Sequence, residues 1–561
     1  MRELENNNIN ILKGSVEYAL YKDQELDEYK NNPFIEALPS IFSEDEIIDR
    51  FYNIPSFNEE YNIKSKNIRF HIIKRIKEYS QVLPIHFLIE TKLSMIIRRG
   101  YLARNPLDAS YFQRLDVLNS LKKEKGINSD DIDYKMKYMR STADSLTIIG
   151  ISGMGKTTAV ERLLLMYPQV IKHNNYNNNH FTRTQIVWLK IDCPYDGNLS
   201  TLCKSFFKAI DDILGTNYLL KYGYTSKVTS TMMLSMTQLA SLYGIGVLVI
   251  DEIQQLLNTK NNIDDMMNFF VTLSNTVGIP TVLIGTPKAD QIFKGNFRQA
   301  RRATSDGCIM WDRMKYNSIE WELIIDRLWE MQCLKEYTPI TDKLKEALYD
   351  ETQGIVSVLI NLFILVQEKA LLNENEKITI ELIRETGQQD LKLLKPILTA
   401  LRKNKKIDIA KYDDIALDYE SISNNIYTQI EVVERMSMLY KKNIEDIDSI
   451  RKNRVENIVI EIKSLNITPL LTDKDILKEV TKEVESNPYN MKLDELKGKC
   501  IRKLIDINEK VQSKKSIIDK NIIETNGLLK IYDTAIKSKL HVYDKLNELG
   551  YIKNPIDELI C

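Results

Sequence analysis

The chain has 561 residues, and 77 lysines and arginines balance 78 aspartates and glutamates to a formal net charge of −1. This length is typical of about three or four domains, and the charge balance excludes binding of nucleic acid through overall basicity. The six cysteines form no C-x-x-C pair and the five histidines do not cluster near them, which indicates a reduced chain without a zinc site. No stretch approaches the ~18 apolar residues of a membrane span, so we expect a soluble, cytoplasmic protein with no membrane partner.

Residues 1–140 mix short amphipathic segments with polar turns, and we expect an N-terminal extension rich in helix. Ser43, followed by three acidic residues, is typical of a helix start. A second helix is expected over residues 80–99, with a break at Pro84. Such a region serves either as a partner-binding arm or as a cap on the core, and the sequence leaves both open.

A glycine-rich motif spans residues 150–158, which read G-I-S-G-M-G-K-T-T and match G-x-x-x-x-G-K-[ST]. An apolar, β-branched run at 145–149 precedes it, and residues 158–167 have the apolar spacing of a helix. Strand, glycine loop and helix are the context in which this motif cradles phosphates, so a purely structural turn is disfavoured. The predicted nucleotide-binding residues are Gly150, Ser152, Gly153, Gly155, Lys156, Thr157 and Thr158.

Within this motif two side chains have predicted roles in binding ATP with Mg²⁺. Lys156 would reach the β- and γ-phosphates, and the hydroxyl of Thr157 would be a ligand of Mg²⁺.

Residues 141–315 alternate strands and helices, a pattern that favours a parallel sheet flanked by helices. Strands are expected at 185–192, 246–251 and 280–285, helices at 199–214 and 231–243, and a loop in the Asn-rich stretch 174–180. The strand at 246–251 ends in Asp251 and Glu252, which is typical of a Walker B motif. Asp251 would hold the Mg²⁺ shell and Glu252 would polarise the attacking water, although an Asp-Glu pair after an apolar run also occurs by chance.

Two further features follow the next strand. Thr286 stands where ATPases of the AAA+ class place sensor 1, the polar residue that contacts the γ-phosphate or the water. The alternative for Thr286 is a helix N-cap with Pro287 at the first helical position. Arg298, Arg301 and Arg302 stand where AAA+ proteins carry an arginine finger, which reaches a neighbouring protomer's γ-phosphate; the alternative is three solvated arginines.

Residues 316–395 are expected to form a helical lid, and residues 396–561 a charged, all-helical C-terminal region without a catalytic site. At the lid position where AAA+ proteins offer a sensor 2 arginine, this chain has Val356, Ser357 and Val358. The predicted fold is therefore an α/β AAA+ P-loop ATPase core with a small lid, an α-rich N-terminal extension and a helical C-terminal region.

Several short runs resemble the TnsC family, the AAA+ regulators of Tn-seven-type transposition, which are close to the TniB and MuB ATPases. The runs are Asn32–Pro39, Arg98–Pro106, Tyr167–Ile171, Leu189–Cys193, Leu248–Gln254, Asn268–Thr272, Ile284–Ala289 and Arg298–Arg302. They cover roughly residues 30–400, and the C-terminal third resembles the family mainly in length and position.

The resemblance implies a bacterial, ATP-dependent protein that oligomerises on double-stranded DNA as a ring or helical filament. It also implies two kinds of protein partner: a target selector, met by the N-terminal region, and transposase subunits, met by the C-terminal region. ATP hydrolysis would then dismantle the assembly.

The sequence also offers a candidate DNA surface and leaves rival functions open. Binding of DNA by such an assembly should depend mainly on phosphate contacts, and the basic stretch of Lys204, Lys208, Lys221 and Lys227 is the candidate; the alternative is ordinary surface lysines. The rival functions are a STAND-type signalling ATPase, a helicase loader that binds single strands, and a structural nucleotide-binding scaffold.

Overall fold

A computed structural model describes most of the chain. The described residues are 12–55, 61–62, 64–123, 141–225, 228–258, 266–267, 269–270, 273–274, 278–294, 301, 304–373, 375–404, 409, 412, 414, 449, 451–464, 469–485, 487, 493–525, 527–538 and 541–548. The chain divides into two compact units, the first of Met1–Glu336 and Ile340–Tyr440, the second of Tyr337–Pro339 and Lys441–Cys561. The predicted domain limits at 140, 315 and 395 fall inside the first unit and stay predictions.

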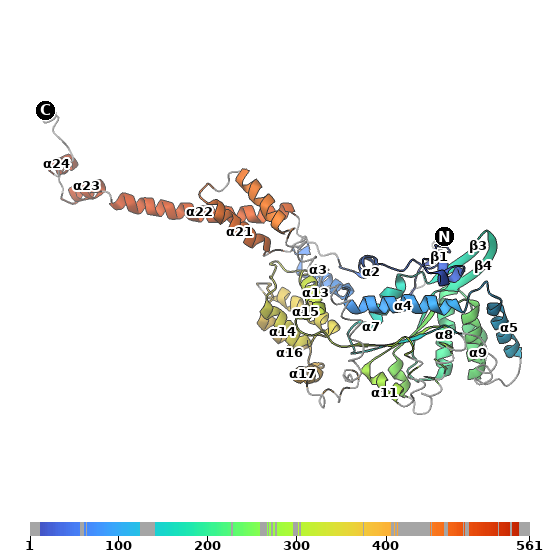
Figure 1. Ribbon diagram of the computed structural model, residues 1–561. Coiled ribbons are helices and arrows are strands. Elements are labelled where there is room, and N and C mark those ends of the chain that lie inside the picture. Colours follow the sequence, from blue (N-terminus) through green and yellow to red (C-terminus); the bar gives the residue numbers. More distant parts are fainter. Residues whose placement is uncertain are drawn as a thin grey trace, which may run out of the picture. The chain divides into compact units, whose positions relative to one another are not determined.

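The centre of the first unit is a sheet of five parallel strands (Figure 1). The strands are β2 (Ser145–Gly150), β5 (Trp188–Asp192), β6 (Val247–Asp251), β7 (Thr281–Gly285) and β8 (Cys308–Trp311), in the order β5-β6-β7-β2-β8. Their apolar, β-branched residues are buried almost completely, as a strand covered on both faces requires. Because the carboxyl ends of parallel strands meet at one edge, Gly150, Asp251 and Gly285 come together there.

Helices lie on both sides of this sheet, with α4 on one side and α11 on the other in Figure 1. The helical elements of the core are α7 (Lys156–Leu165), α8 (Leu199–Leu214), the π-helix η4 (Leu219–Tyr224), α9 (Thr229–Leu242), η5 (Ile253–Asn258), η7 (Pro287–Ala289) and α11 (Asp290–Lys294). The predicted parallel α/β core is confirmed. The sequence did not reveal β8, which has only four residues.

A second sheet of three strands, ordered β1-β3-β4, corrects two expectations. The strands are β1 (Val16–Tyr18), β3 (Val170–Tyr176) and β4 (Asn179–Ile186). Residues 174–180, expected as a loop, include the tip of the antiparallel β3-β4 hairpin, where Asn177 and Asn178 have φ values of 46° and 63°. Two positive φ values suit a tight type I′ turn, and asparagine tolerates them. The expected strand at 185–192 is divided between β4 and β5.

The N-terminal region consists of short helices that pack on the core. They are η1 (Asp27–Tyr29), α1 (Pro33–Glu36), α2 (Glu44–Phe51), α3 (Lys66–Ile73), η3 (Lys74–Glu78), α4 (Pro84–Leu102) and α5 (Ala109–Lys123). Ser43 and Glu46 form a capping box, which confirms the predicted start of α2. Pro84 is the first residue of α4, so it begins this helix and does not interrupt one.

Two of the runs that resemble the TnsC family, Asn32–Pro39 and Arg98–Pro106, bind each other and the core. The Asn32 side chain donates to the Tyr101 carbonyl at 2.9 Å, and the Arg98 guanidinium donates to the Pro39 carbonyl at 2.6 Å. The Tyr101 hydroxyl, itself buried, donates to the Gly244 carbonyl at 2.8 Å, just before β6. This part of the N-terminal region therefore packs on the core, and its role as a partner-binding arm stays a prediction.

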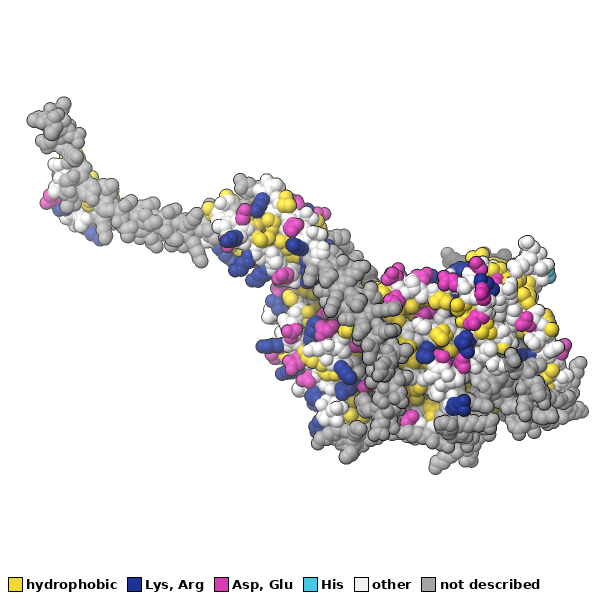
Figure 2. Space-filling view, in the orientation of Figure 1, with side chains coloured by type: hydrophobic (Ala, Val, Ile, Leu, Met, Phe, Trp, Pro, Cys, Tyr) yellow, Lys and Arg dark blue, Asp and Glu magenta, His cyan; other side chains and the backbone are white. Residues whose placement is uncertain are grey.

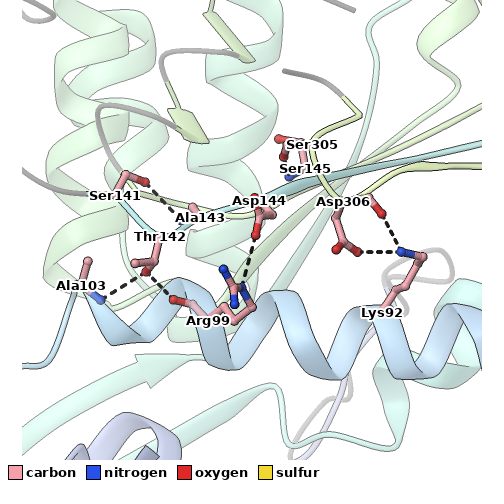
Figure 3. Close-up of polar contacts among 10 residues, drawn as sticks. All are labelled: Lys92, Arg99, Ala103, Ser141, Thr142, Ala143, Asp144, Ser145, Ser305 and Asp306. Carbon is pink, nitrogen blue, oxygen red and sulfur yellow. Dashed lines mark hydrogen bonds and ion pairs between the residues drawn. The ribbon is translucent and has the colours of Figure 1, made fainter. Parts of the chain in front are cut away.

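Helix α4 also makes polar contacts with residues that lie just before β2 and β8 (Figure 3). Lys92 donates to the Asp306 carbonyl at 2.6 Å and pairs with its carboxylate at 3.2 Å. Arg99 pairs with Asp144 at 3.4 Å, and the Thr142 hydroxyl donates to the Arg99 carbonyl. These contacts hold α4 against the amino end of the P-loop strand.

The lid is helical, as predicted, and the N-terminal region contacts it. Its helices are α13 (Ile319–Trp329), α14 (Asp342–Thr352), α15 (Val356–Leu372), α16 (Ile380–Asp390) and α17 (Lys395–Lys403). Trp321, Trp329 and Phe363 are buried in its core. Helices α3 and η3 pack on α15, and the Lys74 ammonium pairs with the Glu368 carboxylate at 2.6 Å.

The described residues of the second unit are mainly helical, as predicted for the C-terminal region. It contains a helix at 451–464, then α21 (Asp473–Glu485), α22 (Leu493–Thr525), α23 (Gly527–Lys537) and α24 (Val542–Glu548). Ile458, Val480 and Leu504 belong to its apolar core.

Within the described residues, no single helix is both long and apolar enough to cross a membrane; α14 and α15 pass that test only jointly, as a pair bent by 118°.

Candidate active site

The P-loop joins β2 to α7 and folds around its own lysine. Gly153 and Gly155 have φ values of 85° and 93°, and Gly155 is the N-cap of α7 in the left-handed conformation, which favours glycine. The Lys156 ammonium donates to the carbonyls of Gly150 at 2.7 Å and Ile151 at 3.0 Å. Burial lowers the pKa of Lys156 to about 8, although Asp251, Glu252 and Asp414 raise it. The site is therefore built for a strongly anionic ligand.

The predicted Mg²⁺ residues lie in contact. The Thr157 hydroxyl donates to the Asp251 carboxylate at 2.8 Å, and Asp251 is only 3% exposed at the end of β6. Lys190 pairs with the same carboxylate at 3.5 Å. Hydroxyl and carboxylate oxygens are the donors that Mg²⁺ takes, and Mg²⁺ usually has only one or two protein ligands of this kind.

Glu252 follows Asp251 in an unusual backbone conformation. Its φ is 59°, in the left-handed region that few residues other than glycine adopt. Its backbone N–H donates to the Asp251 carboxylate at 2.8 Å, which fixes this bend. Desolvation, and then the charge of Asp251, raise the pKa of the Glu252 carboxyl group. A carboxylate with a raised pKa is suited to accept a proton from water.

Gln254 connects Glu252 to the predicted sensor residue, Thr286. Its amide nitrogen donates to the Glu252 carboxylate, and its amide oxygen accepts from the Thr286 backbone N–H at 3.1 Å. The Thr286 hydroxyl makes no N-cap hydrogen bond to the helix that follows and donates instead to the Asp414 carboxylate at 2.9 Å. The Thr286 side chain therefore does not cap the following helix, and its sensor role stays a prediction.

These groups line one cavity of about 350 Å³. Its polar end is formed by residues 152–159 of the P-loop with Asp251, Glu252 and Thr286. Its other walls come from the N-terminal region and the lid: Phe51, Lys77, Tyr79, Ser80, Gln81, Leu83, His86, Ile324, Val356, Ser357 and Ile360. One polar end and one apolar end suit the phosphates and the base of a nucleotide, respectively.

The apolar end includes an imidazole that stays neutral. The rings of Phe51 and His86 lie 4.2 Å apart between centroids and are tilted by 30°. Burial lowers the pKa of His86 to about 3. The His86 Nδ1 accepts from the Leu83 backbone N–H at 3.1 Å, so this nitrogen carries no proton.

The lid reaches the P-loop through Ser357, one of the three residues found in place of a sensor 2 arginine. The Ser357 backbone N–H donates to the Gly153 carbonyl at 3.0 Å. A Cβ at Gly153 would lie 2.3 Å from the Ser357 hydroxyl oxygen, and the φ of 85° at this residue favours glycine in any case.

Of the other predicted site residues that the structure describes, Gly150, Arg301, Lys204, Lys208 and Lys221 are not part of this lining. Arg301 is exposed, while Arg298 and Arg302 lie outside the described residues. Lys204 and Lys208 lie one helical turn apart on α8, and the Lys204 and Lys221 ammonium groups lie 5.9 and 5.2 Å from the ring centroids of Tyr224 and Tyr222 on η4. Lys227 lies outside the described residues. On the face in Figure 2, acidic and basic side chains of the first unit are interspersed.

Sequence reasoning missed Gln254, the N-terminal wall and Asp414. Gln254 lies inside one of the runs that resemble the TnsC family, two residues after Glu252, which was a usable signal. Residues 77–86 and Asp414 carry no motif, and only the tertiary fold brings them to the P-loop.

The strand, P-loop, helix and Asp-Glu pair define this site as that of a P-loop nucleoside triphosphatase. The model of the family described as "AAA domain" matches residues 139–293, and the chain therefore carries an AAA+ ATPase domain with the AAA+ P-loop fold.

Three solved structures are distant likenesses of this chain. The Aeropyrum pernix ORC1 protein in complex with DNA has a TM-score of 0.31 at 12% identity over 58% of this chain and 83% of that one. The Pyrobaculum aerophilum Cdc6p has a TM-score of 0.29 at 14% identity, over 50% of this chain and 66% of that one. The Thermotoga maritima RuvB Holliday junction branch migration motor has a TM-score of 0.25 at 13% identity, over 54% of this chain and 89% of that one. The family model and the P-loop geometry, and not these structures, identify the AAA+ domain.

Among curated proteins, the trigger factors of three Buchnera aphidicola strains are 24% identical over 202 residues, which are 34% of this chain. The chain thus spans 40% of the length of these relatives.

Proposed function

We propose that this protein hydrolyses ATP and uses the cycle to control its assembly on double-stranded DNA, as a TnsC-type regulator of transposition. The single observation that supports hydrolysis most directly is the connected set at the cavity's polar end. The set consists of Lys156, the Thr157–Asp251 pair, and Glu252 and Thr286, which are connected through Gln254. All of these residues line the cavity except Gln254, which is hydrogen-bonded to two that do.

In this proposal the P-loop amides and Lys156 bind the phosphates of ATP. Thr157 and Asp251 would hold Mg²⁺, which, when bound, neutralises charge on the β- and γ-phosphates. Glu252 accepts the proton of the attacking water, and Gln254 orients its carboxylate while placing Thr286 toward the terminal phosphate.

Oligomerisation is proposed because the described site contains no arginine for the transition state. Arg301 is exposed and lies outside the cavity lining, so it is free to reach a neighbouring protomer. An arginine finger supplied in trans would make hydrolysis depend on assembly. Arg298 and Arg302 remain alternatives for this role.

Binding of double-stranded DNA is proposed through Lys204, Lys208 and Lys221, beside the exposed Tyr224. Lysines contact phosphates without reading sequence, which suits a protein whose insertion site is chosen by another component. The target selector and the transposase subunits are proposed as partners from the family resemblance alone.

The test compares wild-type protein with Glu252→Gln, with and without double-stranded DNA. We expect DNA to stimulate hydrolysis by the wild type, and Glu252→Gln to bind ATP but to lose about 10²-fold or more of the rate. Glu252→Gln should also hold the ATP-dependent assembly on DNA, as measured by light scattering or mass photometry. Glu25→Gln, at an exposed glutamate of the N-terminal region, serves as the control.

The outcomes separate the rivals. Hydrolysis indifferent to DNA, with no assembly on it, would overturn the proposal and favour a signalling ATPase. Assembly on single strands but not on duplexes would favour a helicase loader. Binding without hydrolysis under all conditions would favour a structural scaffold.

A further inference from the structure

Asp414 lies at the phosphate end of the cavity although it comes from outside the α/β core. Its carboxylate accepts a hydrogen bond from the Thr286 hydroxyl at 2.9 Å. Its backbone carbonyl accepts one from the Ser152 N–H of the P-loop at 3.4 Å. Both Thr286 and Ser152 line the cavity.

The local chain brings Asp414 there after the lid. Helix α17 ends at Lys403, and Ile409 is then buried, with 5% exposure. The Tyr412 N–H donates to the Ile409 carbonyl at 2.9 Å. Asp414 itself is exposed, so its carboxylate can exchange these partners for solvent at small cost.

The hydrogen-bond donors around Asp414 are those that a terminal phosphate would use. A P-loop amide and a sensor hydroxyl are anion-binding groups, and a carboxylate offers them acceptor oxygens of the same kind. The charge of Asp414 also acts on the Lys156 ammonium, together with the charges of Asp251 and Glu252. Asp251 and Glu252 have assigned roles in the proposed reaction, and Asp414 does not.

We propose that Asp414 is an internal competitor for the terminal phosphate of the bound nucleotide. Its carboxylate takes the Thr286 hydroxyl, and its carbonyl the Ser152 amide, and ATP must displace both to bind fully. ADP lacks the terminal phosphate and leaves the Thr286 contact intact. The inference depends on the proposed ATP-binding function and adds to it a built-in bias against ATP relative to ADP.

The experiment measures the Kd of a slowly hydrolysed ATP analogue and of ADP, with Mg²⁺, by titration calorimetry. Wild type is compared with Asp414→Asn and Asp414→Ala. The control is Asp23→Asn, which removes one exposed carboxylate in the N-terminal region. We expect both Asp414 variants to bind the ATP analogue about three- to tenfold more tightly, the size of one exposed charge-assisted hydrogen bond. The Kd for ADP should change less than about twofold, and Asp23→Asn should match the wild type.

Three outcomes would overturn the inference while ATP binding by the wild type stands. They are unchanged affinity for the analogue, weaker affinity, and equal gains for ADP and the analogue. A fall in turnover with unchanged affinity would assign Asp414 to hydrolysis instead. Failure of the wild type to bind either nucleotide would overturn the proposed function and this inference with it.

Discussion

The Arg69 guanidinium on α3 and the Glu376 carboxylate after α15 form two hydrogen bonds, of 2.6 and 2.9 Å, in the interior of the first unit. Both side chains are 1% exposed. The pair joins the N-terminal region to the lid, and Arg69 also donates to the Cys333 carbonyl at 3.3 Å. The nucleotide cavity is lined by both of these regions, so this ion pair helps to hold its walls together.

Removal of this ion pair should destabilise the first unit. Glu376→Gln leaves the buried Arg69 charge without its counter-charge, and we expect a loss of about 3 kcal/mol in the free energy of unfolding. Urea unfolding measures it. Glu336→Gln is the control, because Glu336 and Lys377 form an exposed pair that should contribute less than about 1 kcal/mol. Equal losses of unfolding free energy in the two variants would contradict the expectation that the buried pair stabilises the protein more than the exposed one.

Gln254 should be needed for turnover more than for binding. Gln254→Ala removes the hydrogen bonds that orient Glu252 and Thr286, and we expect the rate of ATP hydrolysis to fall about tenfold with little change in the Kd for ATP. Steady-state hydrolysis and equilibrium titration give the two quantities. Gln255→Ala is the matched control, since Gln255 bonds to Asn258 and not to Glu252 through its side chain. A comparable fall in the hydrolysis rate of both variants would contradict the proposal that Gln254 orients Glu252 and Thr286.

The affinity for ATP should fall in alkaline solution. The pKa of Lys156 is about 8 because of burial, and the phosphates bind the protonated amine. As the pH rises through 8, the free protein loses this proton, so ATP binding must restore it. We expect the Kd to rise by up to about tenfold per pH unit above 8. Calorimetry in two buffers of different ionisation enthalpy would detect the proton uptake; a constant Kd from pH 7.5 to 9.5 in folded protein would contradict it.

Acid should destabilise the first unit through two buried histidines. Burial lowers the pKa of His86 to about 3 and of His173 to about 4. The unfolded chain therefore binds more protons below pH 6.5, and stability is lost as the pH falls below that value. At pH 5 each should cost about 2 kcal/mol relative to neutral pH.

This linkage can be isolated with one variant and its control. His173→Gln should lose less stability between pH 7.5 and 5 than the wild type, whatever its stability at pH 7.5. His71→Gln, at an exposed histidine, should keep the wild-type dependence. Urea unfolding at both pH values is the measurement, and parallel curves for all three proteins would contradict the prediction.

Charge reversal of the α8–η4 lysines should weaken DNA binding. Changing Lys204, Lys208 and Lys221 to Glu leaves three phosphates without a cationic partner. The slope of log K against log salt should therefore decrease by about 0.9 for each phosphate that the protein no longer neutralises. Fluorescence anisotropy with duplex DNA at several salt concentrations measures both the affinity and the slope. The control reverses three exposed lysines of the lid region, Lys377, Lys392 and Lys403. An unchanged slope would show that the candidate surface is wrong.

The sequence predicted the parts of this site that are local in the chain. The P-loop and the Asp251-Glu252 pair each need only a few consecutive residues between a strand and a helix, and their apolar flanks reveal the strands. The wall at residues 77–86 has no such signal, because tertiary packing alone places it. Asp414 contacts a residue 128 positions away, which no periodicity encodes. The β3-β4 hairpin was missed because its Asn-rich tip resembles an open loop.

At Glu252 the left-handed backbone conformation lowers the stability of the fold, while the side chain is needed for the proposed hydrolysis. A residue with a side chain is disfavoured by about 1 kcal/mol or more at a φ of 59°, whereas glycine adopts it freely. A Glu252→Gly protein should therefore fold at least as well as the wild type and yet be inert. A screen for thermal tolerance alone would enrich such variants, and a lineage kept only for its fold would drift toward an ATPase that can no longer complete its cycle.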